Sequence, residues 1–213
     1  EKEQALIIKK EQLSTKKQYI FGVKKYLKIP KASHYPVVIF EPNNLRLFHG
    51  SPENKREYFD DFIEQQQPGY SLHRRTYTRT LAQRNKAIKD LNSTKDQLFV
   101  WDLRLSDLGE IIARARMELI EEINKKISEV YSSISGSKDT LFVQYKSNSS
   151  LAQYGSSMLS QLEKNREADH IRGFTSAGPH RDDFMFSING TSVSTSASRG
   201  ETRTLVLALK IFE

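Results

Sequence analysis

The chain has 213 residues, of which 28% are charged and none is cysteine. The lack of cysteine excludes a disulfide framework, an iron–sulfur cluster, a cysteine-ligated zinc site and a thiol nucleophile. No apolar run is long enough to cross a bilayer, and the first residues lack the basic-then-apolar layout of a secretory signal, so we expect a soluble, cytoplasmic protein without a membrane partner.

The formal net charge is +7, and the basic excess is concentrated in two segments. Residues 1–35 contain nine lysines and three glutamates. Residues 74–89 contain six basic residues and no acidic one. Such segments suit contact with a polyanion such as DNA, RNA or an anionic surface, but they can also simply keep a helix face soluble.

The first fifty residues are predicted to form short strands. Apolar runs at 5–8, 19–23 and 36–40 are separated by basic stretches that we interpret as turns. The third run is rich in β-branched residues and ends at Pro42. The simplest arrangement is a small sheet at the edge of a larger body.

Helical spacing begins at Ser51, which is followed by proline and an acid, and a break is expected at Pro68-Gly69. A second helix is predicted from 70 to 91. Apolar residues then recur in steps of three and four from Trp101 to Ile134, which predicts about 50 Å of helix. Gly109 lies inside this pattern and is a candidate kink. A helix of this length needs a partner, so we expect a helical hairpin or arm, with an ordinary bundle core as the alternative.

The last third of the sequence returns to strands and one helix. We expect a strand at 140–145, a polar loop at 147–157, a short helix at 158–170, and a strand at 184–188 followed by an Asn-Gly hairpin turn. A helix over 202–212 reaches the end of the chain without a breaker, as in a chain cut inside an apolar helix. The two strand-rich ends are expected to share one sheet from which the helices project.

No catalytic motif is present in the sequence. There is no G-x-x-x-x-G-K-S/T loop, no H-E-x-x-H and no G-x-S-x-G, so we predict no catalytic residue and no metal site in this chain. The histidines are scattered without metal-ligand spacing: His34, His49, His73, His170 and His180.

Two short segments carry more information. Gly178 to Asp183 combines a turn with a charged cluster before a strand, and it has a purely structural interpretation as a hairpin lead-in with an Arg–Asp pair. Ser198 to Arg203 enters the last helix, with Ser198 and Glu201 spaced as a capping box that is sufficient by itself. The functional alternative is an anion site, because a helix N-terminus favours phosphate and Gly200 permits close approach.

Taken together, five segments resemble the bacterial RecF family, in the same order and with similar spacing over nearly the whole chain. They resemble its F-x-P-E-D-L, G-S-P with RR-x-F-L-D, Q-R-N, G-P-H-R-D-D and S-x-G-Q-x-R-T motifs. The matching residues are Phe40-Glu41-Pro42-Asn43-Asn44-Leu45, Gly50-Ser51-Pro52 with Arg56-Glu57-Tyr58-Phe59-Asp60, Gln83-Arg84-Asn85, Gly178-Pro179-His180-Arg181-Asp182-Asp183, and Ser198-Arg199-Gly200-Glu201-Thr202-Arg203.

The resemblance implies an α/β fold, a partial ABC/SMC-type ATPase head sheet with a long helical arm (lobe II) inserted. Residues 1–50 would be the strand-rich part of the head, 51–170 the arm, and 171–213 the return to the head with the signature motif. The family's Walker A and Walker B motifs are not in this chain, so the chain alone is expected to be inactive and to bind no cofactor by itself. ATP and Mg²⁺ are expected for the complete protein.

In this family two heads sandwich ATP, and the signature motif of one head reaches the nucleotide of the other. The resemblance therefore assigns Ser198, Arg199, Gly200 and Glu201 to ATP binding in trans. It makes His180, Arg181 and Asp182 candidates for communication between head and nucleotide. The basic segment supplies candidate DNA contacts: Arg74, Arg75, Arg79, Arg84, Lys86 and Lys89.

The implied function is ATP-dependent binding to DNA gaps or junctions in recombinational repair, with a homodimer forming on ATP and RecO/RecR-type mediators as partners. Two alternatives stay open: a non-catalytic DNA- or protein-binding arm, and the head of another SMC-like ATPase or nuclease. The sequence also departs from the family. Glu201 replaces the usual Gln, Asn43 and Asn44 replace Glu-Asp, and no Gln lies near Val38 to coordinate magnesium.

Overall fold

A computed structural model describes residues 4–11, 14–21, 24–26, 46–90 and 94–212 of the chain. Its residues fall into two compact units, Glu1–Ile39 and Phe40–Glu213, which are described separately. The predicted strand at 36–40 and the segment that follows it to Leu45 lie outside the described residues.

The first unit is a three-stranded antiparallel meander of β1 (Gln4–Glu11), β2 (Ser14–Phe21) and β3 (Lys24–Tyr26). The apolar runs at 5–8 and 19–23 do lie largely in strands. The basic stretches beside them are not turns, however, because Lys9 pairs with Lys16 and Ile8 with Lys17 inside the β1–β2 ladder. Main-chain hydrogen bonds continue wherever the backbone is extended, whatever the side-chain charge, and this is why the strands outrun the apolar runs.

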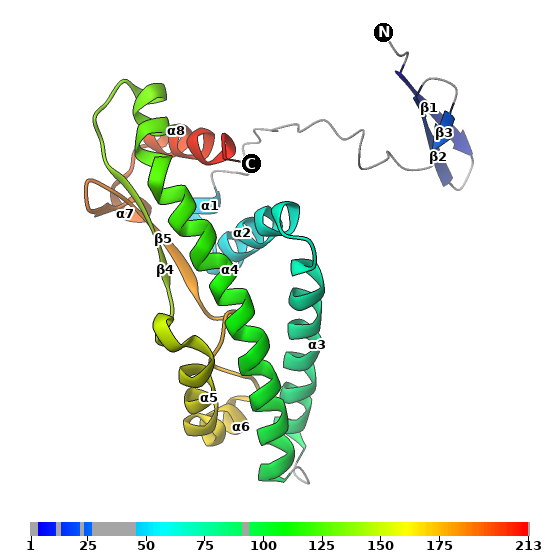
Figure 1. Cartoon of the computed structure of the whole chain (residues 1–213), viewed down its shortest axis with the longest axis vertical. Coiled ribbons are helices and arrows are strands. Elements are labelled where there is room, and N and C mark those ends of the chain that lie inside the picture. Colours follow the sequence, from blue (N-terminus) through cyan, green and yellow to red (C-terminus); the bar gives the residue numbers. More distant parts are fainter. Residues whose placement is uncertain (1–3, 12–13, 22–23, 27–45, 91–93, 213) are drawn as a thin grey trace. The chain divides into compact units, whose positions relative to one another are not determined.

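The second unit begins with α1 (Arg46–His49) and α2 (Pro52–Gln66), which has Ser51 at its N-cap as expected. Then α3 (Tyr70–Lys89) runs antiparallel to the first half of α4, a helix of 41 residues (Lys95–Ser135) (Figure 1). The apolar stripe of α4 is buried at Leu105, Ile112, Ile123 and Ile127. The predicted helical hairpin is therefore confirmed.

Local sequence fixes both ends of α4. Thr94 and Gln97 form a capping box at its start, and Gly136 ends it with φ of 70°. The helix continues through Gly109 without interruption. A Cβ at that position would lie 2.7 Å from the sulfur of Met158, so this glycine serves close packing and is not a break.

The second sheet pairs β4 (Leu141–Lys146) with β5 (Asp183–Ile188), and β6 (Thr191–Ser192) adds to β5. Positive φ angles of 50° at Asn189 and 77° at Gly190 confirm the predicted hairpin turn. The expected single sheet is wrong for the described strands, because β1–β3 pair only with one another and so do β4–β6.

The segment between β4 and β5 differs from the prediction. In place of a loop to residue 157, a 3₁₀ turn (Leu151–Gln153) leads into α5 (Tyr154–Lys164), and α6 (Arg166–Arg172) follows. Tyr154, Met158 and Leu162 are buried at steps of four and anchor α5. The surrounding serines masked this periodicity in the sequence.

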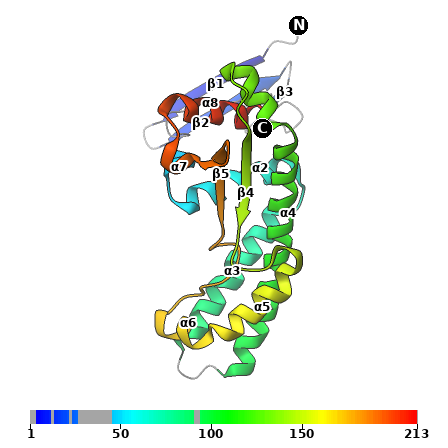
Figure 2. The ribbon, with the colours of Figure 1, turned by 90° about the vertical axis from the view of Figure 1, so that its left-hand side faces the viewer.

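The last elements are α7 (Val193–Ser196) and α8 (Arg199–Lys210), which lies against the C-terminal half of α4 (Figures 1 and 2). An aromatic cluster joins α1 and α2 to β5: the ring centroids of Phe59 and Phe184 are 4.1 Å apart, and those of Phe48 and Phe186 are 4.7 Å apart. The helical hairpin and α8 thus share one core around α4.

Candidate functional site

The N-terminus of α8 presents the predicted signature residues to solvent. Ser198, Arg199 and Gly200 are exposed, and a Cβ built at Gly200 would have only the Ser198 hydroxyl near it, at 3.8 Å. Behind this end, Leu205 and Leu209 are fully buried and hold the helix on its core. The helix terminus is therefore fixed in direction and open to an approaching group.

Glu201 is committed to its own helix. Its Oε2 accepts the Ser198 N–H at 2.7 Å, while the Ser198 hydroxyl accepts the Glu201 N–H at 3.2 Å. These bonds lower the pKa of the Glu201 carboxyl. The predicted capping box is confirmed, and the carboxylate is turned back on the backbone.

A second group of polar residues is buried where α2, α4 and β5 meet. Arg116 of α4 binds both carboxylate oxygens of Asp60, at 2.8 and 2.9 Å, and donates to the Pro179 carbonyl at 2.7 Å. Tyr70 donates to the same carboxylate at 2.7 Å. Burial opposes the charged form of Arg116, but Asp60 and Tyr145 outweigh it and hold the pKa above its ordinary value.

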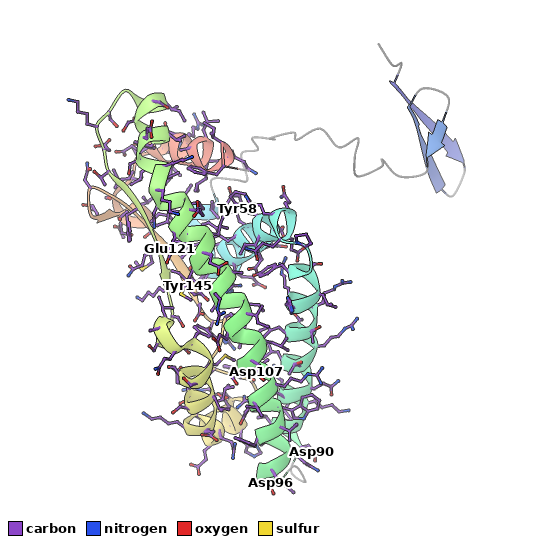
Figure 3. All side chains as sticks on the ribbon, in the orientation of Figure 1. Tyr58, Asp90, Asp96, Asp107, Glu121 and Tyr145 are labelled. Carbon is purple, nitrogen blue, oxygen red and sulfur yellow. The ribbon has the colours of Figure 1, made fainter. Side chains whose placement is uncertain are left out.

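The carboxylate of Asp182 accepts from two tyrosines, Tyr145 at 2.5 Å and Tyr154 at 2.6 Å. Burial first, then the neighbouring Tyr145 and Asp182, keep the pKa of Tyr154 above its usual range. Figure 3 shows Tyr145 beside the middle of α4, far along the hairpin from Asp96 at its end. The predicted Arg–Asp pair of this segment is not formed among the described residues, because Asp182 bonds to tyrosines and Asp183 to Lys55.

His180 is held as a neutral imidazole between two partners. Its Nε2 lies 3.1 Å from the Thr175 carbonyl, which can only accept, so Nε2 carries the proton and Nδ1 accepts from the Tyr77 hydroxyl at 2.6 Å. Burial lowers the pKa of His180 to about 4, and the nearby arginines act in the same direction. Arg181 also donates to Thr175 and lies 4.7 Å over the Phe174 ring.

The six basic residues of α3 divide into three groups. Arg75, Arg79, Lys86 and Lys89 are exposed. Arg74 is paired with Asp61 at 2.8 Å, with Glu64 and Asp60 further away. Arg84 is completely buried and bonds to Asp102 at 2.5 Å, Asp169 at 2.8 Å and Thr175. Arg84 therefore cannot contact DNA, and that prediction is wrong.

The sequence reasoning missed the buried ion pairs, although a signal was present. Asp102 and Arg116 fall on the buried stripe of α4, in steps of three and four with Leu105, Gly109 and Ile112. A charged residue on a buried face must find a partner, so these two positions could have been identified as buried ion-pair members.

Within the described residues, no group of three or more histidine, aspartate or glutamate side chains is placed to hold a metal ion. No described helix combines the length and the apolar character that a bilayer crossing requires.

Comparison with known proteins gives a consistent set of relatives, although no protein-family profile matches the chain. The DNA replication and repair protein RecF of Clostridium perfringens is 33% identical over 177 residues, covering 83% of this chain and 49% of the relative. RecF of Streptococcus agalactiae is 35% identical over 196 residues, covering 88% and 53%. The chain spans about half the length of the curated relatives that it matches.

Solved structures agree with the sequence comparison. A structure of the recombination mediator protein RecF with ATP, in the RecFOR pathway, superposes with a TM-score of 0.78 at 25% identity. The superposition covers 92% of this chain and 55% of that one.

Proposed function

Because the chain belongs to the RecF family, we propose that it supplies the helical arm and the signature segment of a DNA replication and repair ATPase. The strand-rich residues 1–50 and the residues from 171 on would belong to the ATPase head, and residues 51–170 to the arm. Catalysis would need the Walker A loop, which binds the phosphates, and the Walker B strand, which ends in an acid; neither motif is in this chain.

One observation carries the proposal: the open N-terminus of α8. Ser198 and Gly200 are exposed, and the Glu201 carboxylate is bonded to the Ser198 N–H, which leaves the N–H groups of Arg199 and Gly200 outside the capping box. A fixed helix N-terminus with accessible main-chain N–H groups favours an anion. In the complete protein this end would contact the γ-phosphate of ATP bound, with Mg²⁺, by the partner head.

In this mechanism ATP acts as a clamp. It would bridge two heads and favour the closed dimer by the difference between its affinities for the closed and open forms. The exposed Arg75, Arg79, Lys86 and Lys89 of α3 would contact DNA phosphates, with cytoplasmic RecO/RecR-type mediators as partners. Arg84 is buried and is not part of this surface.

The test uses the complete reading frame that contains this chain. We replace Gly200 with Asp, because the glycine site has room for a side chain and an acid in the first helical turn does not harm the helix. The added charge should repel the γ-phosphate, so the variant should stay monomeric with ATP, whereas the unmodified protein becomes a dimer. Sedimentation velocity with and without ATP measures this.

Gly200→Ala is the matched control, since it adds the same Cβ without charge and should keep most of the ATP-driven association. Equal ATP-driven dimerisation of the Asp variant and the unmodified protein would rule out a trans role for this helix terminus.

A further inference from the structure

A cleft of about 540 Å³ lies beside the buried network, in a part of the molecule that neither the signature helix nor the exposed face of α3 explains. It is bounded by α2, α3 and the segment that leads into β5, with Ile112 and Arg116 of α4 at its base. Its size suits a small ligand or one unit of a larger one.

Four guanidinium groups line this cleft, and two of them, Arg56 and Arg181, bond to main-chain carbonyls. Arg56 donates to the main-chain carbonyl of Asp182 at 2.8 Å, and Arg181 donates to the carbonyl of Thr175 at 3.2 Å. Neither forms an ion pair within 4.0 Å in the described part of the chain. Burial first and the charge of Arg116 second lower the pKa of Arg56, and they outweigh the opposing effect of the carboxylates of Glu53, Asp183 and Asp182.

The acids that line the cleft are either bonded to other groups or exposed. Asp60 is shared by Arg116, Tyr70 and Arg74, so its charge is already matched. Glu53 and Glu57 line the same cleft and are exposed to solvent, as Arg181 is, so water screens all three charges and the half-buried Arg56 is screened less.

Neutral groups complete the lining. Asn85 accepts twice from Thr175 through its Oδ1, at 2.8 and 2.7 Å, which fixes its amide and leaves the NH₂ side of the group to donate elsewhere. The Tyr77 and His180 pair forms part of the wall without adding charge. The cleft therefore offers cationic forks and a fixed amide donor together.

We infer that this cleft binds a phosphate group, held by Arg56 and Arg181 with Asn85 beside them. A guanidinium presents parallel N–H donors that match the oxygens of a phosphate. Two sources share this chemistry: a free phosphate compound and a phosphate of DNA. Arg74 and Thr78 line both the cleft and the hollow on α3 that contains Arg75 and Arg79, so a strand lying along α3 could reach the cleft.

The experiment uses the 213-residue chain and two probes, pyrophosphate by calorimetry and a fluorescein-labelled DNA duplex by anisotropy. Arg181→Gln removes an exposed cation and should leave folding intact, and Arg56→Gln is the second variant, with thermal unfolding as a check. Arg104→Gln on the exposed surface of α4 is the control with the same charge change. We expect R181Q to weaken the binding of at least one probe tenfold or more, and R104Q less than twofold.

Competition between the probes then identifies the source. Pyrophosphate that displaces the duplex supports a DNA phosphate in the cleft, and pyrophosphate that binds without displacing it supports a free phosphate compound. If R181Q and R104Q bind both probes equally well, the inference is wrong. ATP-driven dimerisation through Gly200 is a separate measurement, so it can succeed or fail without affecting this result.

Discussion

Arg84 shows how the surroundings of a residue, more than its type, decide its role. It belongs to the most basic stretch of the sequence, yet its side chain is completely buried between Asp102 and Asp169. Arg166 lies 3.1 Å from the second oxygen of Asp102 and extends the cluster. These charges tie α3, α4 and α6 together, so the guanidinium acts as a structural link.

Replacing Arg84 with Met should therefore destabilise the fold strongly. The change leaves the buried Asp169 without its cation, and breaking a buried pair in this way costs about 3–5 kcal/mol. Urea unfolding followed by circular dichroism measures the loss. Lys86→Met, two residues further along α3 in an exposed position, should change stability by less than about 0.5 kcal/mol.

A second substitution separates the ion pair from simple packing. Adding Asp169→Asn to Arg84→Met removes the uncompensated charge and should recover part of the lost stability. If the double variant is no more stable than Arg84→Met alone, the loss comes from packing, and the ion pair is not what stabilises this site.

The lowered pKa of His180 predicts that the stability of the fold depends on pH. Its pKa is about 4 in the folded protein and has the ordinary value of 6.5 in the unfolded chain. Between pH 4 and pH 6.5 the unfolded chain therefore binds a proton that the folded protein does not bind. Stability contributed by this residue is thus complete above pH 6.5 and falls as the pH falls, by about 3 kcal/mol at pH 4.

The comparison needed is with His180→Asn, which offers Tyr77 an acceptor in a similar place but does not titrate. Urea midpoints measured from pH 7 to pH 4 should fall more steeply for the unmodified chain than for the variant. Parallel pH profiles would contradict the buried neutral imidazole.

At the scale of elements, local signals predict well and distant partners do not. The ends and periodicity of α4 and the cap of α8 depend on residues within one or two turns, and the sequence predicted the long helix and the cap. The partners of Arg84 lie 18 and 85 residues away along the chain. No local sequence pattern identifies such a distant partner. A charged residue on a buried helix face indicates only that a partner is needed.

The cap of α8 gives a prediction for that helix. Ser198→Ala should cost about 1 kcal/mol of stability, because it removes the acceptor for the Glu201 N–H. Glu201→Gln should cost much less at neutral pH, since an amide oxygen can still accept the Ser198 N–H. Thermal unfolding of both variants provides the comparison, and equal losses would contradict the reciprocal cap.

The contribution of Glu201 to stability should also depend on pH. The lowered pKa of Glu201 means that its stabilisation is present above its ordinary pKa and is lost as the pH falls below it. The Gln variant lacks this dependence, so the stability difference between it and the unmodified chain should shift in favour of Gln in acid.

At the scale of the whole molecule, the sequence predicted the class of fold but not the sheet arrangement. Strand pairing between distant segments depends on tertiary packing, and the described strands form two separate sheets where one was expected. The candidate site was only partly predictable for the same reason. The signature residues are contiguous, whereas the arginine cleft combines residues of α2, α3 and the lead-in to β5.

Net charge is also a property of the whole molecule, and it gives the last prediction. If α3 contacts DNA phosphates, Arg75→Gln with Arg79→Gln should make the negative slope of log affinity against log salt shallower by about 2, since each phosphate contact contributes about −0.9. Fluorescence anisotropy from 50 to 200 mM salt measures both slopes. Removing any positive charge slightly weakens the long-range attraction between the protein and DNA. The double variant Arg104→Gln with Arg114→Gln makes the same charge change at two exposed positions of α4 and is therefore the control. Equal slopes for the two double variants would place the DNA contacts elsewhere on the molecule.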